Sequence, residues 1–300
     1  MCYRYVLEHG REESQCRKKR LKRQTCAVSA LGNGGKTVGN VMRNYHTHTM
    51  RCKHALGTDE EFVITAIEQG FKTLGFSDHT PWPYDNGFVS NIRMDESQLG
   101  DYVSSIRSLQ KKYGDRIEIL IGLECEPFPQ FYPWLKKIKE QYGLDYFILG
   151  NHASQADEIN HFFVQSKNED DLKRYAETTI AGLQSGMFVY LAHPEMAWGN
   201  YQILDDACLR MAETICEEAK KLNIPLEYNL LGNHYRAMNN THGLGYPHEA
   251  FWKIAGEHGN KGIVGIDAHR PVMLTWTDQF ADAQALLRRL GVDVVEQLKI

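Results

Sequence analysis

A repeated alternation of short apolar runs and amphipathic stretches begins at residue 41 and continues to the end of the chain. Each short run has a β-rich composition and ends in a polar cluster, and each longer stretch carries apolar residues at helical spacing. The first helix is predicted to begin at a capping box, with Thr58 as N-cap and Glu61 at the third helical position, and to stop at Gly70. The predicted strands are 41–45, 73–77, 117–123, 146–150, 188–192, 224–228 and 262–266, and the predicted helices are 58–70, 95–113, 131–142, 169–184, 205–222, 247–258 and 278–290.

Seven strand-then-helix units predict an α/β fold with a parallel sheet covered by helices. An open doubly wound sheet and a closed barrel both satisfy this order. The polar clusters, however, follow nearly all the strands and are not confined to one switch point. A barrel is therefore favoured, because it brings all the carboxyl ends of its strands to one rim, where the active sites of such barrels lie.

Histidines and carboxylates dominate this predicted rim. His46 and His48 are two residues apart in an extended segment, so both imidazoles point to the same side of the chain. Imidazole and carboxylate without thiolate suit Zn, Mn or Fe, and nine donors suggest two or three divalent ions that share a carboxylate. The candidate metal ligands are His46, His48, His54, His79, Glu124, His152, His193, Asp267 and His269.

Charge is distributed unevenly along the chain. The net charge is −4, but residues 1–43 hold ten Lys/Arg and three Glu, which leaves 24 basic and 35 acidic residues in the remainder. The acidic body disfavours general nucleic-acid binding. A phosphate substrate would need local positive charge, which bound metal ions supply.

Two further features bound the class of protein. The 42% hydrophobic and 24% charged composition is that of a soluble globular protein, and no apolar run approaches the roughly 18 residues of a membrane span. Seven scattered cysteines without a C-x-x-C pair indicate a reducing compartment, so a cytoplasmic location is expected. No secretory signal is visible.

The first 41 residues differ in composition from the rest of the chain. They contain a basic run, residues 17–23, with no periodic apolar face. We interpret residues 1–41 as a basic, disordered tail or as sequence upstream of a true start at Met42. Residues 42–300 are expected to form a single domain.

The order of these ligands resembles the PHP (polymerase and histidinol phosphatase) superfamily, from residue 42 to about 271. The resemblance implies a distorted seven-stranded (β/α)7 TIM-like barrel with a trinuclear metal site. It also points to the histidinol-phosphatase group through residues 226–229 and 265–269, although Tyr228 stands where that group has an apolar residue. By position, the first ion would be held by His46, His48, Glu124 and Asp267, the second by Glu124, His152 and His193, and the third by His54, His79 and His269.

The expected activity is metal-dependent phosphomonoester hydrolysis, in which a metal-bound hydroxide attacks the phosphorus atom. Arginines in the rim loops would hold the phosphate, with Arg236 the first candidate and Arg51 and Arg270 the others. Asp267, His269 or a metal-bound water would protonate the leaving alkoxide. Trp82 and Tyr84, in the loop after His79, would either wall the pocket or pack against the rim.

The substrate expected from the resemblance is L-histidinol phosphate, an intermediate of histidine biosynthesis. One alternative is another small phosphate ester, a nucleotide or a short oligonucleotide, because metal ligands do not distinguish among these. Two alternatives belong to other functional classes. One is a nucleic-acid-binding protein that docks through its basic tail, and the other is a metal-sensing or storage protein. If a protein that begins at Met42 retains phosphatase activity, the tail takes no part in catalysis. A storage protein would bind metal but hydrolyse no phosphoester. The oligomeric state is left open.

Overall fold

The structure is a computed structural model that describes residues 41–156 and 162–300. Residues Val41–Ile300 form one compact unit. The predicted basic tail lies outside the described residues, apart from Val41. None of the helices in the described part of the chain is long and apolar enough to span a bilayer.

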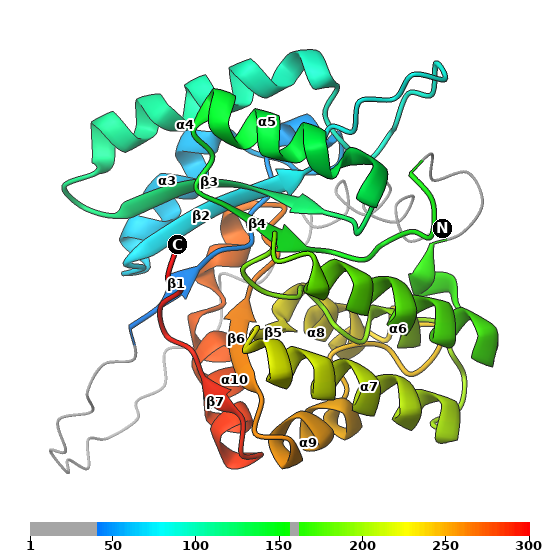
Figure 1. Ribbon diagram of the computed structural model, residues 1–300. Helices are drawn as coiled ribbons and strands as arrows, with labels where there is room; N and C mark the ends of the chain where they lie inside the picture. Colours follow the sequence, from blue (N-terminus) through cyan, green and yellow to red (C-terminus); the bar gives the residue numbers. More distant parts are fainter. Residues whose placement is uncertain (1–40, 157–161) are drawn as a thin grey trace, which may run out of the picture. The chain divides into compact units, whose positions relative to one another are not determined.

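Seven parallel strands form two sheets (Figure 1). The four-stranded sheet has the order β1-β2-β3-β4 and the three-stranded sheet the order β5-β6-β7. All strand pairs are parallel, and His79 at the end of β2 is in register with Glu124 in β3. The strands are β1 (Arg43–Asn44), β2 (Thr73–His79), β3 (Glu118–Cys125), β4 (Tyr146–Leu149), β5 (Leu226–Asn229), β6 (Lys261–Gly265) and β7 (Asp293–Val294).

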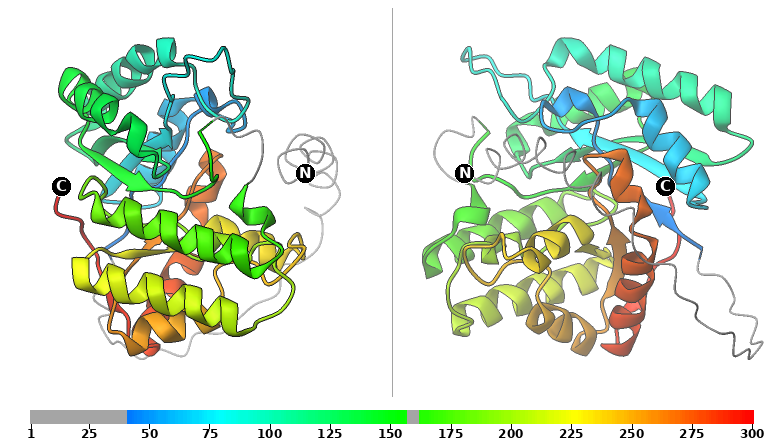
Figure 2. Two further views of the ribbon diagram at one scale, coloured as in Figure 1. Left: turned by 45° about the vertical axis from the view of Figure 1, so that its right-hand side comes forward. Right: turned by 180° about the vertical axis from the view of Figure 1, so that it is seen from behind.

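Helices lie on the outer side of both sheets (Figures 1 and 2). The first helix confirms the predicted capping box, because Thr58 Oγ1 accepts from the Glu61 amide at 3.3 Å and Glu61 Oε2 accepts from the Thr58 amide at 2.7 Å. The helices are α3 (Asp59–Glu68), α4 (Leu99–Tyr113), α5 (Tyr132–Tyr142), α6 (Glu169–Gln184), α7 (Asp206–Leu222), α8 (Leu230–Ala237), α9 (Glu249–Glu257) and α10 (Thr277–Arg289).

Among the described residues the two sheets are joined by isolated bridges and not by a continuous ladder, so the parallel α/β prediction is confirmed but a continuous seven-stranded barrel is not. Leu191 bridges Leu149 of β4 and Leu226 of β5, and Thr47 bridges Ala268 on the other side. The predicted strand 188–192 contributes these bridges but is not a regular strand. One reason is that Pro225, which faces it, has no amide hydrogen to donate, and another is that the chain turns at His193, where φ is +32°.

A small buried cluster connects the inner faces of the two sheets. It joins Tyr146 and Ile148 of β4 to Ile263 of β6, and Tyr45, Tyr190 and Ala192 complete it. The Tyr146 hydroxyl donates to the Tyr45 carbonyl at 2.7 Å. The larger core lies between the sheets and the helices, where the amphipathic faces of the helices are buried.

Two elements were not predicted. Helix α8 follows β5 directly, since Asn229 caps it by accepting from the Gly232 amide at 2.8 Å. Arg236, predicted in a loop, lies on this helix. Strand β7 pairs with β6 near the carboxyl end of the chain.

Candidate metal centre

All nine predicted ligands lie at the carboxyl ends of the strands or in the segments that follow them. His79 and Glu124 belong to β2 and β3, while His46, His48 and His152 follow β1 and β4. These five side chains are buried. Of the remaining candidates, His193 follows the bridge at Leu191, and Asp267 and His269 follow β6. His54 lies in the loop after β1.

Four of them form the first ligand group. Nε2 of His48 lies 3.0 Å from Asp267 Oδ1, and Nε2 of His46 lies 3.5 Å from both Asp267 Oδ1 and Glu124 Oε2. Ligand atoms about 2.0–2.2 Å from a shared ion are separated by roughly 3–3.5 Å, so this spacing fits a metal ion. These are the four residues that the family resemblance assigns to the first ion.

The second group uses the other oxygen of the same carboxylate. Glu124 Oε1 lies 2.9 Å from Nε2 of His193 and 3.1 Å from Nε2 of His152. Gly150 makes room for this carboxylate, because a Cβ at that position would lie 2.3 Å from Oε1. The two oxygens of Glu124 thus face two different ligand groups.

His54, His79 and His269 form the third group, with one ligand atom of each within 4.8 Å of the others. Nε2 of His269 and Nε2 of His54 are 2.9 Å apart. His79 also turns Nδ1 to Glu124 Oε2 at 3.0 Å, so it borders both the first and the third group.

Several buried polar atoms at this site have no hydrogen-bond partner among the described residues: Nε2 of His46, Nε2 of His48, Nδ1 of His79, Oε2 of Glu124 and Oδ1 of Asp267. Buried polar groups are normally hydrogen-bonded, and unpaired ones are costly. These atoms converge on one region, and their chemistry is that of metal ligands. The donor set therefore fits divalent ions.

The protonation states of the metal-free site are mixed. Burial lowers the pKa values of His46 and His48, but neighbouring carboxylates raise both well above the usual value, so an ion would displace a proton from these rings. Burial raises the pKa of Glu124, but the imidazoles of His152, His46 and His79 hold it well below its usual value. Burial and neighbouring histidines lower the pKa of His54 and of His269 to about 3, so both rings are neutral at pH 7. Burial lowers the pKa of His152, but Glu124 and Glu126 raise it to about 10, so a metal ion would displace a proton there.

Carboxylates outside the ligand groups hold three of the imidazoles in place. Glu227 Oε1 lies 2.8 Å from Nδ1 of His46, and Glu126 Oε1 lies 2.8 Å from Nδ1 of His152. Asp78 Oδ1 lies 3.4 Å from Nδ1 of His48. Such contacts fix the tautomer and the ring orientation of a metal-binding histidine. The sequence did not indicate the contact between Glu227 and His46, which joins residues 181 positions apart.

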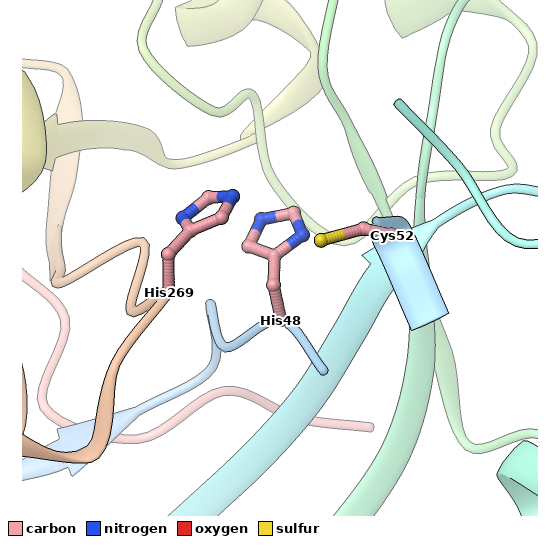
Figure 3. Close-up of side chains that lie close together, drawn as sticks. All are labelled: His48, Cys52 and His269. Atoms are coloured by element: carbon pink, nitrogen blue, oxygen red, sulfur yellow. The ribbon is translucent and has the colours of Figure 1, made fainter. Parts of the chain in front are cut away.

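Cys52 was also missed. It is buried beside His48 and His269 (Figure 3), and one ligand atom of each of these three side chains lies within 4.8 Å of the others. The rings of His48 and His269 are stacked, with centroids 4.0 Å apart and planes 18° from parallel. Cys52 thus adds a thiol next to the candidate ligands, which were predicted from the sequence to be free of thiolate.

Two of the candidate ligands have unusual backbone conformations. Asp267 has φ +56° and His193 has φ +32°, in a region that residues other than glycine rarely adopt. Such strain is typical of functional sites that the surrounding structure holds in place. Here the chain turns just after the Leu191 bridges and just after β6, and the side chains of His193 and Asp267 both come close to His46.

The three candidate arginines have different surroundings. Arg51 donates to Asp59 at 2.9 Å and to Asp101 at 2.7 Å, so two carboxylates occupy its guanidinium. Arg236 is half-buried on α8 and donates to the Pro247 carbonyl. Arg270 is half-buried and follows the ligand His269 directly.

The fold and the site together define an α/β protein with a divalent-metal centre of histidine and carboxylate ligands at the carboxyl ends of its parallel strands. The chain belongs to the PHP domain family, whose model matches residues 44–229. This match confirms the resemblance found in the sequence.

Individual relatives extend the comparison. A probable histidinol-phosphatase from Deinococcus radiodurans is 27% identical over 253 residues, which cover 82% of this chain and 92% of the relative. A probable histidinol-phosphatase from Schizosaccharomyces pombe is 35% identical over 114 residues, which cover 36% of this chain and 37% of the relative. A solved histidinol phosphate phosphatase from Lactococcus lactis, in complex with zinc, L-histidinol and phosphate, has a TM-score of 0.63 at 16% identity, covering 86% of this chain and 98% of that one. At this identity the likeness concerns the fold alone.

Proposed function

We propose that the protein is a metal-dependent phosphomonoesterase that hydrolyses L-histidinol phosphate to L-histidinol and phosphate. Glu124 carries this proposal, because its two oxygens lie between two groups of imidazoles, with Oε2 3.5 Å from His46 and Oε1 2.9 Å from His193. The names of the Deinococcus radiodurans and Schizosaccharomyces pombe relatives support the substrate.

We assign two to three divalent ions (Zn, Mn or Fe) to the ligands. The first ion is proposed to bind His46, His48, Glu124 and Asp267, the second Glu124, His152 and His193, and the third His54, His79 and His269. The two bridged sheets would then act as one distorted seven-stranded barrel that brings these groups to a common rim. Bound divalent ions supply Lewis acidity, neutralise phosphate charge and lower the pKa of water.

The residues of the chain perform the remaining tasks. Arg236 and Arg270 are proposed to bind the phosphate oxygens, because the body of the protein is acidic and the substrate is an anion. Arg51 is the third candidate, although Asp59 and Asp101 already bind its guanidinium. The pKa of Asp267 is raised by burial but held well below its usual value by His46, His48 and His269, so Asp267 is a carboxylate at neutral pH. We assign to Asp267, with His269 Nδ1 3.4 Å away, the transfer of a proton, which the attacking water would lose, to the leaving alkoxide.

A phosphatase panel tests this function. The full-length protein, loaded with Zn or Mn, is supplied with L-histidinol phosphate, sugar phosphates, nucleotides and a short oligonucleotide, and released phosphate is measured. The proposal expects the highest kcat/KM with histidinol phosphate. A clear preference for another ester would keep the reaction and replace the substrate, whereas metal binding without any turnover would favour a storage role.

A further inference from the structure

Glu126 is a buried carboxylate that receives four hydrogen bonds and stands behind a metal ligand. Oε1 lies 2.8 Å from Nδ1 of His152 and accepts from Nη2 of Arg93 at 2.9 Å. Oε2 accepts from the indole Nε1 of Trp82 at 2.7 Å and from Nη1 of Arg93 at 3.1 Å. Both oxygens are thus bound twice, and the carboxylate has little freedom to rotate.

Trp82 and Arg93 flank the loop of residues 83–92, one on each side. This loop is a long excursion between β2 and α4 (Figure 1). Arg93 also donates to the Thr80 carbonyl at 3.2 Å, which closes the base of the loop. Both ends of the loop are therefore attached to the carboxylate that orients His152.

The same loop lies beside a second segment that carries metal ligands. Lys53, which stands immediately before His54, donates to the Ser90 carbonyl at 2.7 Å and to Asp95 at 2.9 Å. The loop thus contacts the His54 segment through Lys53 and the His152 side through Glu126.

The guanidinium of Arg93 is completely buried, as is Glu126. A buried charge is costly unless it is paired and hydrogen-bonded, and here the two-pronged contact with Glu126 satisfies both requirements. It is not available to a phosphate, because the carboxylate occupies it. Trp82 is held in place by stacking on Phe131, with ring centroids 5.3 Å apart.

We propose that Glu126 couples the loop of residues 83–92 to the metal ligand His152, and that Arg93 is a positioning residue for the ion that His152 binds. The chain of contacts runs from Arg93 through Glu126 to Nδ1 of His152, whose Nε2 lies 3.1 Å from the shared ligand Glu124. A change at Arg93 or Trp82 then alters the His152 ring without touching a ligand. The effect on metal affinity is independent of the substrate, whereas the effect on catalysis rests on the proposed function.

Four variants of the full-length protein test this coupling: Arg93→Met, Arg93→Lys, Trp82→Phe and Trp134→Phe. Trp82→Phe keeps the ring but removes the donor to Glu126. Trp134→Phe is the matched control, since its ring is in the same aromatic cluster but its Nε1 donates to Glu96 at 3.1 Å. Affinity for Zn is measured by competition with a chromophoric chelator, folding by circular dichroism, and kcat and KM with histidinol phosphate.

Arg93→Met is expected to weaken the binding of one ion by about 10–100-fold, as is usual when a residue that orients a metal ligand is lost. Arg93→Lys should recover part of this loss, because it keeps the charge but not the two-pronged geometry. Trp82→Phe should weaken the same ion less, and Trp134→Phe should leave every ion unchanged. The effect on turnover should appear in kcat and in its dependence on metal concentration more than in KM.

Folded Arg93→Met protein with wild-type affinity for every ion would overturn the coupling. If Arg93→Met does not fold, the comparison of Trp82→Phe with Trp134→Phe tests the coupling. Equal Zn affinities of these two variants would also overturn the coupling. A wild-type protein without phosphatase activity but with the expected differences in Zn affinity would refute the proposed function alone.

Discussion

Nδ1 of His46 lies 2.8 Å from Oε1 of Glu227, while Nε2 of the same ring faces Glu124 and Asp267. Glu227 is fully buried and also accepts from the His193 amide at 3.2 Å and the Asn229 amide group at 3.0 Å. One carboxylate therefore fixes the ring of one ligand and the backbone of another.

Changing Glu227 to Gln should weaken metal binding by about 10–100-fold, because the ring of His46 loses the carboxylate that orients it and raises its basicity. Zn titration of the metal-free protein measures this. Glu195→Gln is the matched control, because Glu195 is equally buried but accepts from Trp252 Nε1 at 2.8 Å and from the His248 amide at 3.0 Å. Equal losses in the two variants would contradict the role of Glu227.

Changing Gly265 to Ala tests the contact between Glu227 and His46 in a second way, because it crowds the Glu227 carboxylate from the neighbouring strand. A Cβ at Gly265 would lie 1.8 Å from Oε1 of Glu227, so the carboxylate or the strand must move. We expect a fall in the melting temperature and in metal affinity. Gly70→Ala is a comparison in which no atom lies within 4 Å of the new Cβ, so only its left-handed backbone, at φ +81°, opposes it. A Gly265→Ala protein with unchanged metal affinity would show that Glu227 can be displaced without consequence.

The clustering of the candidate ligands was predictable from the sequence because most of them stand at the end of a recognisable apolar run, as His46 and His48 do after residues 41–45. Parallel strands then bring these positions together whatever the details of the loops. Glu227 was not predicted, because its contact with His46 joins residues 181 positions apart. Strand periodicity indicates that both face the interior but not that they touch.

The secondary structure predicted from the sequence was wrong where tertiary contacts decide the local structure. Residues 188–192 have the composition of a strand, yet they form isolated bridges at Leu191 and a few backbone hydrogen bonds, and not a regular strand. Helix α8 was interpreted as loop because its glycine and asparagine weaken the helical pattern, although Asn229 caps it. The buried pair of Arg93 and Glu126 was invisible because a charged residue in a loop is normally exposed.

Changing Glu124 to Gln should remove at least one ion per chain and lower kcat/KM by at least about 100-fold, because two ligand groups share this carboxylate. Metal content by elemental analysis and phosphate release measure the two effects. Glu118→Gln is the control in the same strand, since Glu118 is exposed at its amino end and accepts from Thr73 Oγ1 at 2.6 Å. Unchanged metal stoichiometry in Glu124→Gln would refute the bridging assignment.

Changing Arg236 to Ala should raise KM for histidinol phosphate by about 10–100-fold, the effect of losing one charge-assisted hydrogen bond to a phosphate. Metal content should stay at the wild-type level. The parallel Arg51→Ala variant should have a smaller effect on KM, because the Arg51 guanidinium is bound by Asp59 and Asp101. A larger KM effect in Arg51→Ala would reverse this assignment.

Acid should destabilise the metal-free protein through His54 and His269. Burial and neighbouring histidines lower both pKa values to about 3, whereas the unfolded chain has a pKa near 6.5. Between these values the unfolded state binds more protons, so the stability that the neutral rings contribute is lost as the pH falls from about 6.5 to 3. Denaturant unfolding measures the free energy of unfolding at each pH. Its slope against pH should be shallower in His269→Gln than in the wild-type protein by up to about 1.4 kcal/mol per pH unit. Identical slopes in the two proteins would refute this account.

We predict that hydrolysis of a phosphomonoester depends on the metal centre around Glu124. The direct measurement is a titration of the metal-free protein with Zn or Mn in which bound metal and phosphate release from L-histidinol phosphate are followed together. We predict no activity without metal and a rise that is complete only when two or more ions are bound per chain. Full activity in the chelated protein, or none with all sites filled, would contradict the claim.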